Sequence, residues 1–418
     1  MLPLTLPTIQ NWSCHNCSGC CRQHLIEITE DERQRILKQN WTAADGIAAE
    51  QPVIEPHAGP FWKRRYRLAH RDDGACVFLD ERGLCRIHAK FGEAAKPLAC
   101  RIYPYAFHPA GKRITVSLRF SCPSVVANRG RAVASNRDEL KSIAKLVVPE
   151  GVERLPPPRI SARETVGWDD VLRIVTAFDE LLADTQTPFI ERLYRTNCVA
   201  TLIEQAQFKL IQGERLDELL DLLIGVAGEE PLPEPTPPQA VAAVHFRLLV
   251  AHYARKDTVA DLSGGWAHRW RLLRAAMTFA KGAGSTASFQ TDLAEVPFAQ
   301  LEPPFGGLPD GADELLTRYL RVKVQGFHFF GRAYYDVPLV EGFHSLTLIV
   351  PAICWIARWL AASDKRDRVT LADFERAVAI ADHHHGYSPV FGSTGFRWRV
   401  RFLAQSGELG KLLLWYAR

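Results

Sequence analysis

Four cysteines occur in eight consecutive residues of this sequence, Cys14-His15-Asn16-Cys17-Ser18-Gly19-Cys20-Cys21. Four more follow within the first third of the chain, and the remaining two, Cys198 and Cys354, stand singly in apolar helical patterns typical of core residues. Closely spaced thiols are a common ligand pattern for metals. The sequence therefore predicts an amino-terminal metal-binding module, with these ligands: Cys14, Cys17, Cys20, Cys21, Cys76, Cys85, Cys100 and Cys122.

Disulfide bonds and unligated thiols are the alternatives, since an even set of cysteines can also staple a small secreted domain. The first twelve residues, MLPLTLPTIQNW, lack the basic start, the continuous apolar stretch and the cleavage pattern of a secretory signal. We therefore expect a cytoplasmic chain, whose thiols stay reduced and can bind metal. The neighbours Cys20 and Cys21 also favour ligation, because a disulfide between adjacent residues is strained.

The spacing leaves the identity of the metal open. Cys14-x-x-Cys17 is a pair typical of a structural zinc site, which takes four ligands in a tetrahedron. Four thiols in one short loop also suit an iron–sulfur cluster, whose several iron atoms accept closely spaced cysteines. Eight thiols could hold two sites, or one cluster with an open iron and additional structural ligands.

The later cysteines lie in segments with a local pattern of their own. Residues 74–80 and 83–88 predict two short strands joined by a turn at Asp80-Glu81-Arg82-Gly83, which would place Cys76 beside Cys85. Cys100 lies between two prolines, and Cys122 directly precedes a third, which fixes the chain direction.

These motifs resemble a known family. The C-x-x-C-x-x-C-C run, the G-x-C at Gly83–Cys85 with Ile87-His88, and Pro97 with Cys100-Arg101 are similar to the CxxCxxCC family of proposed zinc- or iron-chelating domains, over about residues 12–125. The whole chain more weakly resembles the bacterial flagellin lysine N-methylases, which join such a cluster to a long helical region. That resemblance implies a [4Fe–4S] cluster, S-adenosylmethionine as methyl donor and a protein substrate such as flagellin.

Beyond about residue 130, apolar residues recur at helical spacing, as in residues 168–182, 190–203 and 216–223. We predict a mainly α chain with two domains. Residues 1–130 form a small cysteine-rich, metal-binding domain with short strands, and residues 131–418 form a large helical domain with a proline-rich insertion near 228–239. Within the first domain, Thr29 and Glu32 predict the start of a helix, and residues 113–120 predict a strand.

The carboxy-terminal half contains the most apolar segment, Leu346–Ile356. It is shorter than the roughly 20 residues that span a bilayer, so we expect a buried helix and no membrane span. The aromatic residues at 319–335 either pack the core or line a cofactor or peptide pocket. His383-His384-His385 would end a helix opened by Thr370, where positive charge suits the helix dipole, because three adjacent helical residues cannot face one metal ion.

Charge and motifs exclude several function classes. The net charge of +4 gives no clear case for nucleic acid, and the basic run at residues 63–67 is either a solvated strand edge or a site for a phosphate or an acidic partner. A P-loop, a dinucleotide fingerprint, a His-Glu-x-x-His motif and a nucleophile elbow are all absent, so catalytic residues stay unassigned. Two classes remain: a cluster-dependent protein lysine methylase, and a non-catalytic, zinc-stabilised binding or metal-handling protein.

Overall fold

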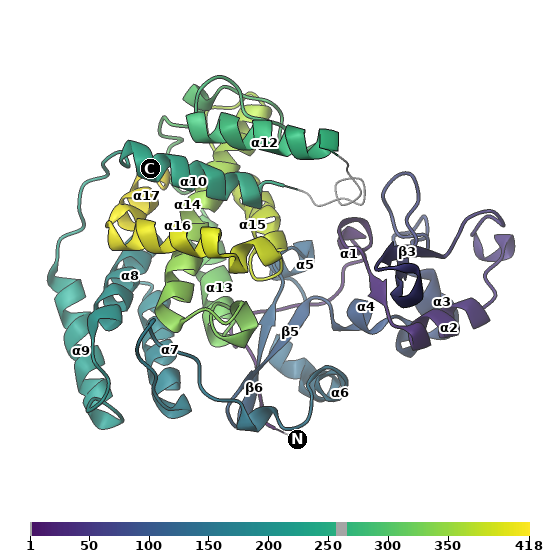
Figure 1. The fold of residues 1–418 in the computed structure, drawn as a ribbon, viewed down its shortest axis with the longest axis horizontal. Helices are drawn as coiled ribbons and strands as arrows, with labels where there is room; N and C mark the ends of the chain where they lie inside the picture. The colour runs from purple at the N-terminus through teal and green to yellow at the C-terminus, as the bar shows by residue number, and fades with distance from the viewer. Residues whose placement is uncertain (1, 256–265) are drawn as a thin grey trace. The chain divides into compact units, whose positions relative to one another are not determined.

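The computed structural model describes residues 2–255 and 266–418, and the chain divides into two compact units. Unit 1 comprises residues 1–10, 107–121 and 132–418, and unit 2 comprises residues 11–106 and 122–131. Helices dominate the described residues and the strands are short, so the prediction of a mainly α chain with a small cysteine-rich part is confirmed (Figure 1).

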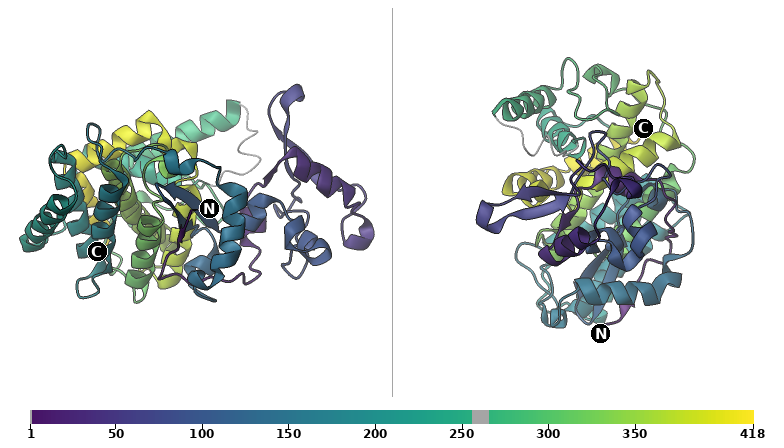
Figure 2. Two further views of the ribbon diagram at one scale, coloured as in Figure 1. Left: turned by 90° about the horizontal axis from the view of Figure 1, so that it is seen from below. Right: turned by 90° about the vertical axis from the view of Figure 1, so that its right-hand side faces the viewer.

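Unit 1 is organised around the helix α14 (Leu339–Ser363), which is buried along almost its whole length. A helix that is buried all round needs neighbours on every side. Helices α8, α10, α15, α16 and α17 pack against it (Figure 1), and Figure 2 shows these teal and yellow helices together with the green α14 in two further views. The longer helices of unit 1 are α6 (Arg137–Val147), α7 (Trp168–Ala183), α8 (Phe189–Gln205), α9 (Glu214–Glu229), α10 (Ala240–Tyr253), α12 (Trp266–Lys281), α13 (Ala312–Gln325), α14, α15 (Leu371–His384), α16 (Thr394–Gln405) and α17 (Glu408–Tyr416).

Helix α14 contains the apolar segment that the sequence assigns to the core. Among the described residues it is the one helix whose length and composition would suffice to cross a membrane, but its apolar window lies wholly inside the protein. Pro351 lies within it without ending it. The predicted helical segments at 168–182, 190–203 and 216–223 are confirmed as α7, α8 and α9, and residues 231–239 form a connector without helix before α10.

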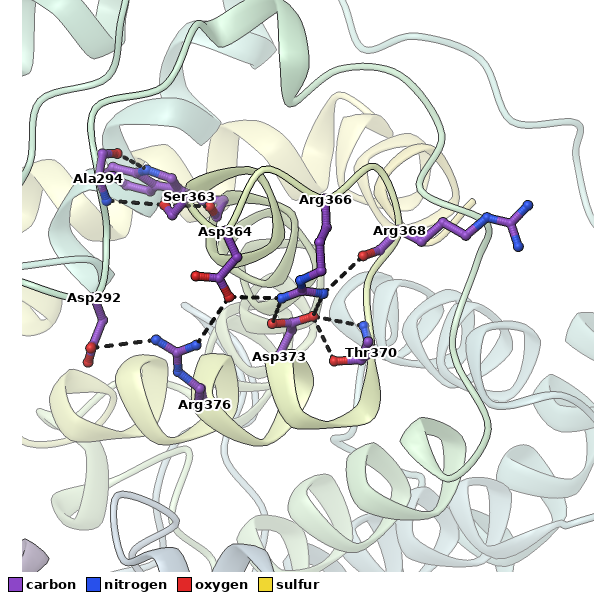
Figure 3. Close-up of polar contacts among 10 residues, drawn as sticks. Asp292, Ala294, Ser363, Asp364, Arg366, Arg368, Thr370, Asp373 and Arg376 are labelled. Carbon is purple, nitrogen blue, oxygen red and sulfur yellow. Dashed lines mark hydrogen bonds and ion pairs between the residues drawn. The ribbon is translucent and has the colours of Figure 1, made fainter.

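The turn between α14 and α15 is held by a polar network (Figure 3). Arg366 donates to both carboxylate oxygens of Asp373, at 2.7 and 2.8 Å, and to Asp364 at 3.0 Å. The backbone N–H and the hydroxyl of Thr370 also donate to Asp373, both at 2.8 Å, which confirms that Thr370 opens α15. The side chain of Arg368 points away from this network.

A small sheet has the strand order β1 (Leu4–Thr5), β6 (Arg113–Leu118), β5 (Tyr105–Ala110), and all of it except the first two residues of β5 belongs to unit 1. Strand β1 runs parallel to β6, and β6 confirms the strand predicted at residues 113–120. The hydroxyl of Thr115 donates to the carbonyl of Gly326 at 3.0 Å, at the end of α13. The residues that begin the chain are therefore part of the helical unit.

Unit 2 has a second sheet, with the order β2 (Glu27–Ile28), β4 (Arg65–Leu68), β3 (Ile54–Ala58), in which neighbours are antiparallel. The predicted helix start is confirmed, because Thr29 and Glu32 form a capping box at α2 (Glu30–Lys38). The strands predicted at residues 74–80 and 83–88 are wrong. A turn closed by the bonds Asp80–Leu84 and Gly83–Asp80 leaves only an isolated bridge between Leu79 and Cys85, and the chain then enters α3 (Arg86–Phe91).

Candidate metal centre

All eight predicted ligands lie in unit 2, and all ten cysteines of the chain are free thiols. Cys14 and Cys17 precede the short helix α1 (Gly19–Gln23), which contains Cys20 and Cys21. Cys76 and Cys85 flank the turn before α3, Cys100 lies in α4 (Leu98–Ile102), and Cys122 caps the start of α5 (Pro123–Val126). Four stretches of the chain thus bring thiols to this unit: residues 14–21, residues 76–85, α4 and the start of α5.

Five of these cysteines form a first group: Cys20, Cys21, Cys76, Cys85 and Cys100. The sulfurs of Cys20 and Cys21 are 3.9 Å apart, and the backbone N–H of Cys76 donates to the carbonyl of Cys21 at 2.8 Å. Cys76 belongs to the apolar core of unit 2, against which Cys21, Cys85 and Cys100 pack. Four of these five cysteines are therefore part of this core or packed against it.

Burial and neighbouring thiols oppose ionisation of Cys20, Cys76 and Cys100. Burial, and to a smaller extent the charges of Cys85 and Cys20, raise the pKa of Cys76 to about 12. The pKa of Cys100 is raised by burial and then by Cys76, and that of Cys20 by the thiol of Cys21 and then by burial. A bound cation would remove this penalty, because metal ligation favours the thiolate.

Lys96 is a positive charge beside this group that the sequence analysis did not identify. It lowers the pKa of both Cys20 and Cys100, and its side chain is half-buried. Its position in the sequence, four residues before Cys100 and directly before Pro97, is the signal that could have identified it. Lys96 thus favours the thiolate forms of Cys20 and Cys100, against the effect of burial.

Cys17 and Cys122 form a second group. The pKa of Cys122 is raised mainly by burial and further by the charge of Cys17. A Cβ atom at Gly19 would lie 3.2 Å from the ring of Pro123 and 3.5 Å from the sulfur of Cys17, so the loop and the start of α5 are in close contact. Cys14 is exposed, with its thiol 3.8 Å from the side-chain oxygen of Asn16.

The turn after Cys76 supports the cysteine loop directly. Gly83 has a φ of +80°, and a Cβ atom there would lie 2.7 Å from the carbonyl oxygen of Asn16 and 2.9 Å from the hydroxyl of Ser18. Both Asn16 and Ser18 themselves have positive φ values, which cost free energy in residues with side chains. The tight contact at Gly83 therefore helps to fix the conformation of the loop.

The spacing of the donors can be compared with the geometry of metals. A Zn–S bond of about 2.3 Å in a tetrahedron separates two sulfurs by roughly 3.8 Å, close to the value for Cys20 and Cys21. Within residues 2–255 and 266–418, however, no three His, Cys, Asp or Glu side chains converge closely enough to ligate a single ion. In a [4Fe–4S] cluster each thiolate binds a different iron, so its sulfurs stand further apart.

The histidines and the basic run near the cysteines have other partners or are exposed. His15 is 3.1 Å from the hydroxyl of Ser124 through Nδ1, and His88 is exposed on α3. In the basic run, Arg65 pairs with Glu27 at 3.1 Å and Arg67 with Glu55 at 2.5 Å. The strand-edge interpretation is therefore wrong, because β4 (Arg65–Leu68) lies between β2 and β3 and these two arginines pair with carboxylates of the neighbouring strands.

A buried polar cluster in unit 1 was not identified from the sequence. The ammonium of Lys323 is 2.6 Å from Asp382 and 3.4 Å from Nδ1 of His328, whose ring stacks on that of His108 at 4.7 Å. Burial lowers the pKa of Lys323, and it lowers that of His108 to about 3. Such clusters of shifted pKa values are candidate functional sites. The residues of this cluster occur singly within apolar segments, and the sequence alone does not indicate that they lie together.

The interpretation of the three adjacent histidines as charged helix-end residues is wrong for His385. It is fully buried beyond the end of α15, its Nδ1 lies 2.9 Å from the hydroxyl of Tyr253, and burial lowers its pKa to about 3. A neutral ring cannot compensate the helix dipole. His384 is also buried and hydrogen-bonds to the carbonyl of Arg255 at 2.5 Å.

Comparison with known proteins gives matches to the cysteine-rich part. Two lysine-N-methylases, from Salmonella choleraesuis and Salmonella typhimurium, are 27% and 26% identical over 118 residues, which cover 27% of this chain and 29% of each relative. The flagellar biosynthetic protein FliU of Salmonella muenchen is 25% identical over 118 residues, 27% of this chain and 69% of that protein. The aligned region thus spans less than a third of the length of either methylase. No solved structure matches.

The family match covers the same part of the chain. Residues 13–123 match the model of the CxxCxxCC family, described as "Putative zinc- or iron-chelating domain". This segment includes each of the eight cysteines of unit 2. The match supports metal binding by the cysteine cluster, and it identifies residues 13–123 as similar to the CxxCxxCC domain.

Proposed function

We propose that unit 2 binds an iron–sulfur cluster and that the chain is an S-adenosylmethionine-dependent protein lysine N-methylase. The observation that carries the first part is the gathering of Cys20, Cys76, Cys85 and Cys100 at the apolar core of unit 2, which contains Cys76, against which Cys85 and Cys100 pack, and where Cys20 lies 3.9 Å from Cys21. These four thiols would hold the cluster, and Lys96 would offset part of its negative charge. Cys21 is adjacent to this set and can replace Cys20 as a ligand.

The spacing of the sulfurs supports an iron–sulfur cluster over zinc. The pair Cys20–Cys21 has the separation expected for two ligands of one zinc ion, but no third donor among the described residues converges with them. The remaining members of the first group influence one another's ionisation without converging on one point. A cluster would supply redox-active iron, or an open iron able to bind a small chelating group.

The proposed activity is supported by the similarity to two lysine-N-methylases over the cysteine-rich region. In this reaction the ε-amine of a lysine forms a bond to the methyl carbon of S-adenosylmethionine while the bond from that carbon to sulfur breaks. The amine loses one proton, and S-adenosylhomocysteine leaves. The similarity to FliU supports a flagellar protein such as flagellin as the substrate.

Purification without oxygen tests the metal. We expect a brown protein that contains iron and acid-labile sulfide in equal amounts. Cys76→Ser should lose most of this iron, whereas the control Cys198→Ser, which changes a half-buried thiol in α8 of unit 1, should keep it. A colourless protein with stoichiometric zinc, or equal iron in both variants, would refute the iron–sulfur assignment.

A second assay tests the activity. The iron-loaded protein is incubated with S-adenosylmethionine and purified flagellin, and the flagellin is examined by mass spectrometry. We expect added methyl groups on lysine, in wild type and in Cys198→Ser but not in Cys76→Ser. Iron-loaded protein that leaves flagellin unmodified would refute this substrate while leaving the metal assignment intact.

The second candidate is a zinc-stabilised protein without catalytic activity. The 3.9 Å separation of the Cys20 and Cys21 sulfurs favours it, because two ligands of one zinc ion have this spacing. The metal would then contribute folding free energy to unit 2 and supply no chemistry. Zinc in the purified protein together with no binding of S-adenosylmethionine in calorimetry would select this function.

A further inference from the structure

Helix α12 exposes a stripe of large apolar side chains. Trp266, Trp270, Leu273 and Met277 are 76%, 60%, 49% and 64% exposed. Their spacing of four, three and four residues places them within an arc of about 60° on one side of the helix, at 100° per residue. Isolated exposed apolar residues are ordinary on a protein surface, but a continuous stripe marks an interaction site.

The opposite side of α12 fixes the helix to unit 1. Phe279 is fully buried, with its ring centroid 5.3 Å from that of Phe298 and 5.7 Å from that of Trp359. Arg247 of the neighbouring α10 donates to the carbonyl of Phe279 at 2.9 Å and to that of Ala280 at 3.1 Å (Figure 1). The anchored side and the exposed stripe therefore lie on different faces, and the stripe points to solvent.

The helix is also strongly basic. Residues 266–281 contain three arginines and one lysine and no acidic residue, an excess as large as the net charge of +4 of the entire chain. All four cations are exposed: Arg269, Arg271, Arg274 and Lys281. On a helical projection Arg269 lies on one side of the stripe and Arg274 and Lys281 lie on the other. The guanidinium of Arg269 is 5.9 Å from the ring of Trp266.

We infer that α12 binds to the surface of a membrane that contains anionic lipids. An apolar stripe flanked by cations is the pattern of a helix that lies in the interface, with its apolar side chains among the lipid headgroups and its cations on the lipid phosphates. Tryptophan suits this depth because its ring is amphipathic. A second copy of the chain is a poor partner, since two such helices would place four positive charges against four others.

This inference is independent of the metal and of the proposed activity. It is tested by sedimenting the full chain with vesicles of phosphatidylcholine alone or with phosphatidylglycerol added. We expect binding only to the anionic vesicles, and a loss of binding at high salt, because exposed charges are screened.

Variants assign the binding to α12. Trp266→Ala with Trp270→Ala should weaken binding by about tenfold or more, since each tryptophan loses apolar contact. Arg269→Gln with Arg274→Gln should weaken it and reduce its dependence on salt, while the control Arg368→Gln, an exposed arginine outside α12, should bind as wild type does. All these residues are exposed, and unchanged circular dichroism would verify the fold.

Three results would overturn the inference. The first is equal binding to both kinds of vesicle, or binding to neither. The second is a loss of binding in Arg368→Gln equal to that in the α12 variants. The third is a concentration-dependent dimer that the tryptophan variant abolishes without any vesicle binding by wild type, which would assign the stripe to a second copy.

Discussion

The contact between Gly83 and the cysteine loop makes a quantitative prediction. In Gly83→Ala the new methyl group would lie 2.7 Å from the carbonyl oxygen of Asn16 and 2.9 Å from the hydroxyl of Ser18, so the loop has to move. Gly74 provides a matched control. It has a φ of +77°, close to the +80° of Gly83, and nothing lies within 4 Å of a Cβ atom there.

The two substitutions share one cost and differ in another. Alanine in the left-handed conformation costs about 1–2 kcal/mol at either site. Only Gly83→Ala adds overpacking, which costs about 1–3 kcal/mol more. The difference between the variants therefore measures the contact with the loop, and the shared backbone cost cancels.

Hydrogen exchange of α1 provides the assay. The N–H of Arg22 donates to Ser18 at 3.1 Å and that of His24 to Cys20 at 3.3 Å, so both report on opening of the loop. We expect these amides to exchange faster in Gly83→Ala than in Gly74→Ala, by about tenfold for each 1.4 kcal/mol. Equal exchange in the two variants would refute the idea that the turn supports the loop.

Three further predictions concern unit 1. Arg366→Ala should lower the free energy of unfolding by about 1–3 kcal/mol, because it leaves the carboxylate of Asp373 buried without its cation, whereas Arg368→Ala should change it by less than about 0.5 kcal/mol in the same urea titration. Burial lowers the pKa of His344 to about 4, so its ring is neutral in the folded protein at neutral pH. As the pH falls from about 6.5 to 4, the unfolded chain binds the proton first, and the free energy of unfolding should fall by about 1.4 kcal/mol per pH unit for this group. The variant His344→Gln should therefore have a shallower pH dependence of unfolding. Cys354→Ser should cost about 1–3 kcal/mol without loss of metal, since it buries a hydroxyl in α14; iron loss in this variant would contradict its assignment to the core.

Local patterns predicted much of the fold. The capping box at Thr29 and Glu32, the strand β6 and the helices α7–α9 follow from short-range spacing, and the structure contains each of them. The strands predicted around Cys76 and Cys85 were wrong, because a turn and a helix bury the apolar residues of these segments. The alternation of apolar and polar residues alone does not distinguish this arrangement from strands.

The arrangement of the site depends on long-range packing. The sequence indicates which residues are thiols, but not that Cys100 lies near Cys76 while Cys122 lies near Cys17. Likewise, the hydrogen-bond partner of His385 is Tyr253 of α10, more than a hundred residues away in the sequence, so the burial of His385 could not be read from the adjacent histidines. Charge at physiological pH is a property of these surroundings and not of residue type alone.

The discontinuous course of unit 2 has a consequence for dissecting this protein. The chain leaves the unit after Ala106 and re-enters it at Cys122, and the residues between supply β6 to the other unit. Unit 2 contains neither end of this sequence, because residues 1–10 and 132–418 both belong to unit 1. A gene fragment that stops near residue 131 would retain every cysteine of the cluster. It would, however, lack α13, so β6 would lose this neighbour and the hydroxyl of Thr115 would lose the carbonyl of Gly326 as its acceptor.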